Sequence, residues 1–225
     1  MRARGRKIGS ALMAVIMTLS LLPVNVMAAS TTECSGGDGC SHEAAITATH
    51  YDTLAEALSA AEEGQTVKLL KDIDNSVDDP NYEKGINYSL KAGTTLDGDG
   101  HTISGHIGVY IPAAGATVTN VKFVDIHNDT EVDKASCDRY GWTSKTGNQS
   151  AIYASGLTGK AVITGCAFDN IDWDAIQITP TKGASIVIKN NVFQHTNATG
   201  TQVRYVHIEH TQSSWLDVKM DEWGC

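Results

Sequence analysis

Two aspartates separated by one residue, Asp97 and Asp99, lie in the segment TLDGDGHTI at residues 95–103. Closely spaced carboxylates with intervening glycines are typical of calcium loops, because several oxygen ligands must converge on the ion from a tight turn. An EF-hand loop requires glycine at its sixth position and glutamate at its twelfth, whereas here these positions hold Thr102 and Gly108. We therefore interpret the segment as a turn between two strands and expect no cofactor, with calcium binding as the alternative.

Sulfur chemistry is available from five cysteines: Cys34, Cys40, Cys137, Cys166 and Cys225. Cys34 and Cys40 flank the flexible sequence SGGDG, and in an oxidising compartment we expect them to close a small disulfide loop. Zinc bound by this pair and His42 is the alternative. A fourth ligand and the usual ligand spacing are missing, so we predict no metal site. Because the total is odd, the pairing of the other three cysteines stays open.

Three further groups have residue types suited to acid–base catalysis. A glycoside hydrolase needs two carboxylates, and alternation along a strand could put Asp172 and Asp174 on one side. A polysaccharide lyase needs a basic residue, for which Arg204 is the candidate, although a matching carboxylate cluster is missing. His207 and Glu209 are a third acid–base combination. Aspartates in turns and histidines on surfaces are common without catalysis, so a purely structural role is the alternative interpretation of these residues.

The first 29 residues have the organisation of a secretory signal peptide. A basic start precedes an apolar run over residues 8–22, and small residues follow at 26–28. After residue 29 the sequence contains no run of about 18 apolar residues, the length that a membrane-spanning helix needs. We therefore expect a secreted or cell-surface protein with no membrane span after removal of the signal.

The charge of the chain excludes one large class of partners. The 225 residues include 17 Lys+Arg and 26 Asp+Glu, for a formal net charge of −9, and the predicted signal peptide carries several of the basic residues. Such a surface repels the phosphates of nucleic acids, which proteins bind through lysine and arginine. We expect no nucleic-acid partner.

Residues from about 53 to 63 have the pattern of one amphipathic helix. Thr53 and Glu56 fit a capping box, in which each side chain pairs with the other residue's backbone N–H, and Gly64 stands where the helix would end. The apolar positions that share one face are Leu54, Ala57, Leu58 and Ala61. Residues 30–50, which precede it, are small and polar and are interpreted as a loose, cysteine-containing lead-in.

The chain then repeats a short unit of strand, corner and strand. Three copies align on a phenylalanine: VTNVKF at 118–123, ITGCAF at 163–168 and IKNNVF at 188–193. The third position of each copy tolerates a left-handed backbone, being Asn120, Gly165 or Asn190. The segment TLDGDGHTI aligns with the same unit, with two additional residues at the corner. A second alternating strand recurs at 109–111, 152–154, 176–178 and 206–208.

This repetition predicts an all-β fold, a parallel β-helix over residues 51–225. If residues 128–150 are an insertion, the period is about 22 to 30 residues, which fits three short strands per coil. The helix near residue 53 would cover the open end of the first coil. We expect an inner column of Phe123, Phe168 and Phe193, and Cys166 on an inward corner in the core rather than as a nucleophile.

The predicted capping helix, TLDGDGHTI, the I-x-N-N-x-F corner and the strand WDAIQI at 173–178 together resemble the pectin-lyase-like superfamily. The resemblance covers roughly residues 51–223 and is greatest to secreted and surface proteins of gut bacteria. It implies a right-handed parallel β-helix with one N-terminal capping α-helix. It implies no single chemistry, since the superfamily includes lyases, hydrolases, adhesins and structural proteins.

Enzymes of this superfamily usually act on an outer strand face, so the outward positions are candidate ligand-binding residues. One such position per coil falls on Tyr110, Tyr153, Gln177 and His207. Further candidates beside this column or from adjoining loops are Gly108, Trp142, Ala151, Trp173, Ala175 and Tyr205. Aromatic faces among hydrogen-bonding groups suit sugar rings, so we expect a polysaccharide or glycan partner. An ordinary exposed sheet face is the alternative, because tyrosine is common there.

Three function classes remain. We favour a non-catalytic glycan-binding or adhesion module. The alternatives are a polysaccharide lyase or glycoside hydrolase that acts on acidic polysaccharide, and a structural segment of a larger surface protein. The sequence VKMDEW at 218–223 aligns with the start of a further, incomplete coil. An open coil exposes apolar side chains and strand edges, so we expect further domains or a partner chain beyond Cys225.

Overall fold

The computed structural model describes residues 40–76, 86–126, 150–171, 174–194 and 205–208. In this part of the chain, no helix is long and apolar enough to cross a membrane. The predicted signal peptide at 1–29, nearly all of the predicted insertion at 128–150 and the expected further coil at 218–223 lie outside the described residues.

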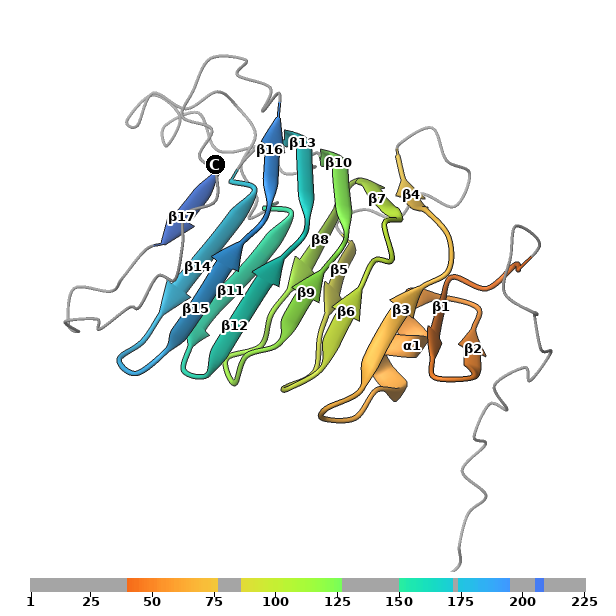
Figure 1. Ribbon diagram of the computed structural model, residues 1–225, viewed down its shortest axis with the longest axis horizontal. Helices are drawn as coiled ribbons and strands as arrows, with labels where there is room; N and C mark the ends of the chain where they lie inside the picture. Colours follow the sequence, from red (N-terminus) through yellow and green to blue (C-terminus); the bar gives the residue numbers. More distant parts are fainter. Residues whose placement is uncertain (1–39, 77–85, 127–149, 172–173, 195–204, 209–225) are drawn as a thin grey trace, which may run out of the picture.

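Three sheets of parallel strands make up most of the described structure (Figure 1). The first contains β3 (Thr66–Leu69), β6 (Thr95–Asp97), β9 (Thr117–Thr119), β12 (Lys160–Thr164) and β15 (Ser185–Lys189). The second contains β4 (Ile73–Asn75), β7 (Thr102–Gly105), β10 (Lys122–Ile126), β13 (Ala167–Ile171) and β16 (Val192–Gln194). The third contains β5 (Ile86–Ser89), β8 (Ile107–Tyr110), β11 (Ile152–Leu157), β14 (Ile176–Pro180) and β17 (Val206–Ile208).

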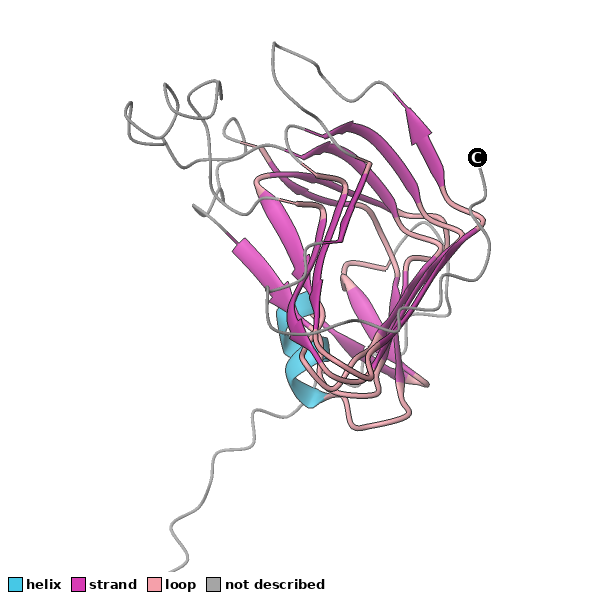
Figure 2. Ribbon diagram, turned by 90° about the vertical axis from the view of Figure 1, so that its left-hand side faces the viewer, coloured by secondary structure: helices cyan, strands magenta, loops and turns pink. Residues whose placement is uncertain are grey.

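Consecutive strands enter these three sheets in rotation. The strands β3, β4 and β5 belong to the first, second and third sheet, and the same order repeats up to β17 within the described residues. Figure 2 shows the strands arranged around a common interior. The predicted all-β class with stacked parallel strands is therefore confirmed, and the arrangement is compatible with a β-helix.

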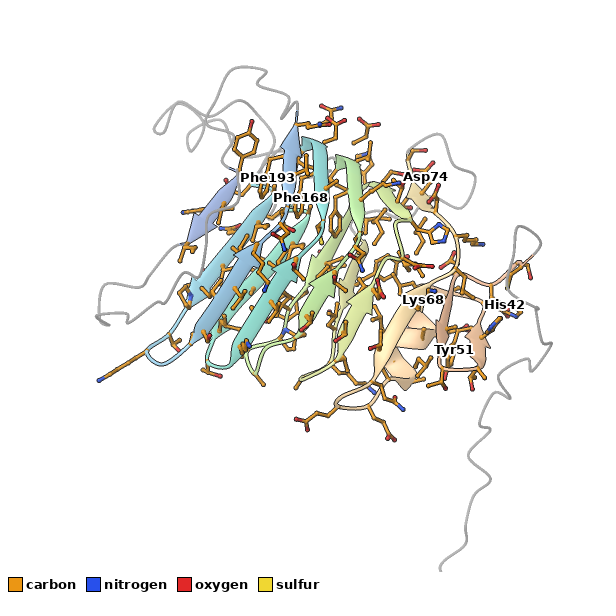
Figure 3. All side chains as sticks on the ribbon, in the orientation of Figure 1. His42, Tyr51, Lys68, Asp74, Phe168 and Phe193 are labelled. Atoms are coloured by element: carbon orange, nitrogen blue, oxygen red, sulfur yellow. The ribbon has the colours of Figure 1, made fainter. Side chains whose placement is uncertain are left out.

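The predicted inner column of phenylalanines is present. Phe168 pairs in register with Phe123 on one side and with Phe193 on the other. The ring centroids are 5.2 and 5.0 Å apart, with interplanar angles of 7° and 9°, and Figure 3 labels the second pair. Phe123 and Phe168 are fully buried. The strand register thus stacks equivalent side chains from successive coils.

The corners between the first and second sheets have the predicted left-handed residues. The φ angles of Asn120, Gly165 and Asn190 are 55°, 67° and 55°. The next position along the chain is buried in each corner, and in the third it holds Asn191. The side chain of Asn191 accepts a hydrogen bond from the Cys166 backbone N–H at 2.9 Å and donates one to the Ile163 carbonyl at 3.0 Å. This amide therefore links two adjacent coils from inside.

The one helix among the described residues, α1 (Leu54–Ala60), begins at the predicted capping box. The Glu56 N–H donates to Thr53 Oγ1 at 3.2 Å, and the Thr53 N–H donates to Glu56 Oε2 at 3.3 Å. The helix ends at Ala60 rather than near residue 63, because the backbone of Ala61 is extended with ψ of 143°. Its buried side chains are Leu54, Ala57 and Leu58, as predicted, and Ala61 is buried just after its end. The helix contacts β3, β5 and a hairpin that precedes it.

That hairpin corrects the expectation of a loose lead-in up to residue 50. The strands β1 (Ala44–Ile46) and β2 (Thr49–Tyr51) pair antiparallel, and β1 also pairs antiparallel with β3. The turn places Thr47 at φ of 54°, where a β-branched residue is uncommon. Asparagine, aspartate or glycine usually marks such a turn, so the sequence contains no local signal for this hairpin.

Replacing Phe168 with alanine should lower the free energy of unfolding by roughly 3–5 kcal/mol, because a fully buried ring is removed. Denaturant unfolding of the chain without its predicted signal peptide measures this. Val192→Ala is the control, since Val192 is 50% exposed on the neighbouring strand β16. A loss under about 1 kcal/mol for Phe168→Ala would contradict the stacked core.

Asn191→Ala should cost about 1–3 kcal/mol, because the Cys166 N–H and the Ile163 carbonyl lose their side-chain partner inside the core. The neighbouring Asn190→Gly should change stability little, because glycine readily adopts the left-handed φ of this exposed position. The same unfolding titrations compare the two variants. Equal stabilities would show that Asn191 does not link the coils.

Candidate functional site

The outward positions of the third sheet form one column, as predicted. Tyr153 on β11 pairs with Tyr110 on β8 and with Gln177 on β14. Gln177 pairs in turn with His207 on β17. All four side chains are half-buried. We call Tyr110, Tyr153, Gln177 and His207 the outer column.

The first two members supply an aromatic surface. The ring centroids of Tyr110 and Tyr153 are 5.8 Å apart, and the rings are tilted by 38° to one another. Neighbouring strands lie about 4.8 Å apart, so these two rings occupy adjacent coils without an intervening residue. The pair offers apolar ring surface together with two phenolic hydroxyls, and each hydroxyl can donate and accept a hydrogen bond.

The other two members are polar and are held by buried side chains. Ser150, which is fully buried, donates its hydroxyl to Gln177 Oε1 at 3.2 Å. His207 Nδ1 lies 2.8 Å from Asp174 Oδ2. The Asp174 side chain is fully buried, whereas that of His207 is 18% exposed. A buried carboxylate therefore fixes the orientation of a partly exposed imidazole.

This contact favours one tautomer of His207. An ionised carboxylate only accepts hydrogen bonds, so Nδ1 carries the proton in the contact with Asp174. In the neutral imidazole, Nε2 is then the acceptor. Such a histidine can orient a ligand hydroxyl or act as a general base. From the sequence, Asp174 was predicted to act with Asp172 as a pair of carboxylates. No local spacing indicates a contact between residues 174 and 207.

Three of the four positions that lie two residues before the members of the outer column are buried. Ala151 and Ala175 are fully buried, and Gly108 is buried as well. Tyr205 is 48% exposed, but its ring centroid lies 5.2 Å from that of Phe193, against the inner phenylalanines. The outward positions predicted two residues before the outer column are therefore wrong at Ala151 and Ala175, whereas Gly108 pairs in register with the exposed Asn87 of β5. Ala151 and Ala175 lie just before β11 and β14, at corners where alternation between the two faces of the strand does not apply.

Five predicted site residues cannot be placed on this face, because they lie outside the described residues: Trp142, Asp172, Trp173, Arg204 and Glu209. Their assignment as ligand-binding or catalytic candidates stays a prediction. Cys34 also lies outside the described residues, so the predicted Cys34–Cys40 disulfide stays a prediction as well.

Cys166 lies in the core, as predicted. Its residue is 1% exposed, and burial raises the pKa of its thiol to about 12. The thiol is therefore protonated at neutral pH, whereas the thiolate is the nucleophile.

The TLDGDGHTI corner is a turn, as predicted. Asp97 Oδ1 accepts hydrogen bonds from the Asp99 N–H at 3.0 Å and from Asn120 Nδ2 at 3.1 Å. Asp99 Oδ2 lies 2.8 Å from Lys68 Nζ, and this hydrogen bond raises the pKa of Lys68. The additional residues Asp99 and Gly100 adopt φ angles of 49° and 85°. Both carboxylates thus tie the corner to neighbouring coils.

Comparison with known proteins adds no assignment, because no protein-family model, curated protein or solved structure matches the chain.

The Asp174 contact makes a spectroscopic prediction. In its neutral form, His207 should have its proton on Nδ1, since Asp174 accepts from that atom. Long-range ¹H–¹⁵N correlation spectra of the imidazole distinguish the two tautomers. His101, which is partly exposed, is the comparison residue in the same spectrum. A neutral His207 with its proton on Nε2 would contradict the contact.

Proposed function

We propose that this protein is a secreted or cell-surface right-handed parallel β-helix of the pectin-lyase-like type. Its outer column binds glycan without catalysing a reaction. The rotation of strands through three parallel sheets supports the fold. The contacts of α1 with β3 and β5, through the buried face of Leu54, Ala57 and Leu58, support a cap over the first coil.

The observation that carries the proposed function is the tyrosine pair at the start of the outer column. Ring faces can stack against the apolar faces of sugar rings, while the phenolic hydroxyls bond to sugar hydroxyls. Tyr110 and Tyr153 present two rings with centroids 5.8 Å apart. Gln177 and His207 continue the same column with an amide and an imidazole whose orientations are fixed. An extended glycan lying across the coils would meet ring surface first and hydrogen-bonding groups next.

The charge of the chain favours a particular class of glycan. The formal net charge is −9, and the described outer column contains no arginine or lysine to pair with carboxylate or sulfate groups. Bringing a polyanion to this surface would therefore cost electrostatic free energy. Neutral oligosaccharides are the expected ligands of the outer column.

Tyr153→Ala should weaken glycan binding about tenfold or more, equivalent to about 1.4 kcal/mol, because one of the two rings of the tyrosine pair is lost. A glycan array identifies a neutral ligand, and calorimetry then compares the variants at matched melting temperatures. Tyr153→Phe keeps the ring and should retain most of the affinity. Val187→Ala, on the first sheet, is the control for an unrelated substitution. Unchanged affinity of Tyr153→Ala on every bound glycan would remove the outer column from consideration.

The second candidate, a polysaccharide-degrading enzyme, is favoured by one observation, the orientation of His207 by buried Asp174. If His207 is a general base, cleavage of a polysaccharide should release reducing ends or unsaturated products, and His207→Gln should abolish that release. Binding without product, in wild-type protein with an intact His207, would favour the non-catalytic function.

A further inference from the structure

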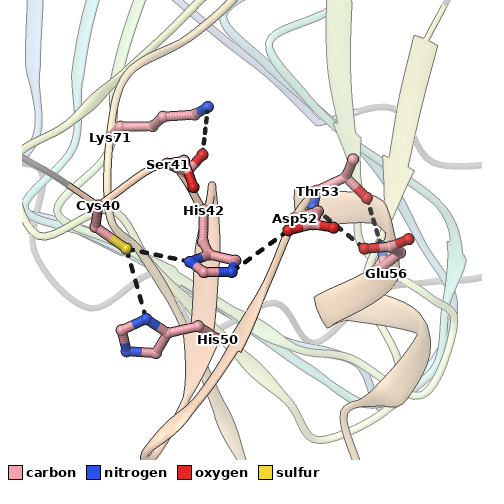
Figure 4. A network of polar contacts seen from close by, with 8 residues as sticks. All are labelled: Cys40, Ser41, His42, His50, Asp52, Thr53, Glu56 and Lys71. Carbon is pink, nitrogen blue, oxygen red and sulfur yellow. Dashed lines mark hydrogen bonds and ion pairs between the residues drawn. The ribbon is translucent and has the colours of Figure 1, made fainter. Parts of the chain in front are cut away.

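A second constellation of chemically active side chains lies at the other end of the molecule. Cys40, His42 and His50 gather beside the β1–β2 hairpin (Figure 4), and His42 is at the opposite end of the long axis from Phe193 (Figure 3). Cys40 Sγ lies 3.3 Å from His42 Nδ1 and 3.5 Å from His50 Nδ1. The three potential ligand atoms all lie within 4.8 Å of one another.

The surrounding backbone holds this constellation in place. The hairpin register brings His50 opposite Ala45, close to the segment that carries the other two side chains. That segment is tied to the chain after β3 by the Leu70 N–H, which donates to the Glu43 carbonyl at 2.9 Å. The Glu43 carboxylate also accepts from the Leu54 N–H at 2.8 Å, at the start of α1. The ligand-type side chains therefore project from backbone that is fixed by β3 and α1.

The distances agree with those of a tetrahedral zinc site. With Zn–S of about 2.3 Å and Zn–N of about 2.0 Å, tetrahedral coordination puts a sulfur and a nitrogen ligand about 3.5 Å apart. The two measured S–N separations are 3.3 and 3.5 Å. One thiolate and two imidazoles are also a donor set that zinc prefers.

An outer contact points to a ligand independently of these distances. His42 Nε2 lies 3.4 Å from Asp52 Oδ1, and the His42 side chain is only 6% exposed. Metal-binding histidines characteristically donate their second ring N–H to a carboxylate, which fixes the tautomer. A proton on Nε2 leaves the lone pair of Nδ1 directed toward Cys40. The Asp52–His42 contact thus prepares Nδ1 as a ligand atom.

We propose that Cys40, His42 and His50 bind one zinc ion, which fastens the segment before β1 to β2 within the hairpin. Binding displaces the Cys40 thiol proton, so that the thiolate coordinates the cation while the proton passes to solvent. Three protein ligands leave the fourth position of the tetrahedron to water or another donor. The proposal does not depend on the glycan-binding function, since the outer column lies on a different part of the fold.

The direct test is metal binding by the chain without its predicted signal peptide, kept reduced and freed of metal with a chelator. Titration with Zn²⁺ against a chromophoric chelator should give about one ion per chain and a raised melting temperature. Substitution with Co²⁺ should give the absorption of tetrahedral cobalt with a thiolate-to-metal charge-transfer band. A spectrum without the thiolate band would overturn the proposal even if no variant folded.

Variants then assign the ligands. His50→Ala and Cys40→Ser should each abolish the cobalt spectrum, and Asp52→Asn should weaken zinc binding about 10- to 100-fold by releasing the His42 tautomer. His101→Ala is the matched control. His101 Nδ1 also lies 3.3 Å from a carboxylate oxygen, that of Asp72, but His101 is not one of the proposed zinc ligands. The His101→Ala variant should bind zinc with the same affinity as the wild type.

The rival state of Cys40 is a disulfide with Cys34. Cys34→Ser should keep the zinc, since the three proposed ligands remain. Loss of zinc binding in Cys34→Ser would overturn the proposed ligand set. Recovery of the secreted protein with a Cys34–Cys40 disulfide by mass spectrometry, and without bound zinc, would also overturn it.

Discussion

The structure depends on one constraint, the parallel register between each strand and the equivalent strand of the next coil. In such a stack, the backbone hydrogen bonds of a strand run to neighbouring coils, so equivalent positions must lie one above another. Phe123, Phe168 and Phe193 are consequently stacked inside the third and later coils, while Tyr153 falls between Tyr110 and Gln177 outside. The same register that builds the core therefore also builds the candidate binding surface.

Features that repeat could be predicted from the sequence for this reason. The pairing of Phe168 with Phe193, the left-handed corner at Asn120 and the outward position of Tyr153 all follow from aligning copies of one unit. The capping box of α1 could also be predicted, because Thr53 and Glu56 are a local pair with a known geometry. In each case a short-range pattern, or its repetition, determines the structure.

Features that occur once could not be predicted in the same way. The β1–β2 hairpin turns through Thr47 without a residue type that marks such turns. The sequence therefore contained no indication that His50 lies close to His42. The contact of Asp174 with His207 joins two side chains 33 residues apart, across coils of unequal length. Ala151 and Ala175 appear outward by alternation, but the corner rotates their side chains into the core. These contacts depend on the three-dimensional path of the chain.

The proposed function requires that the outer column, rather than another face of the stack, receives the ligand. Isotope-labelled protein titrated with a bound neutral oligosaccharide, and followed by NMR chemical shifts, tests this claim most directly. We expect shifts centred on Tyr110, Tyr153, Gln177 and His207, with the outward residues Val162 and Val187 of the first sheet unchanged. Shifts centred on the first or second sheet, with the outer column unchanged, would contradict it.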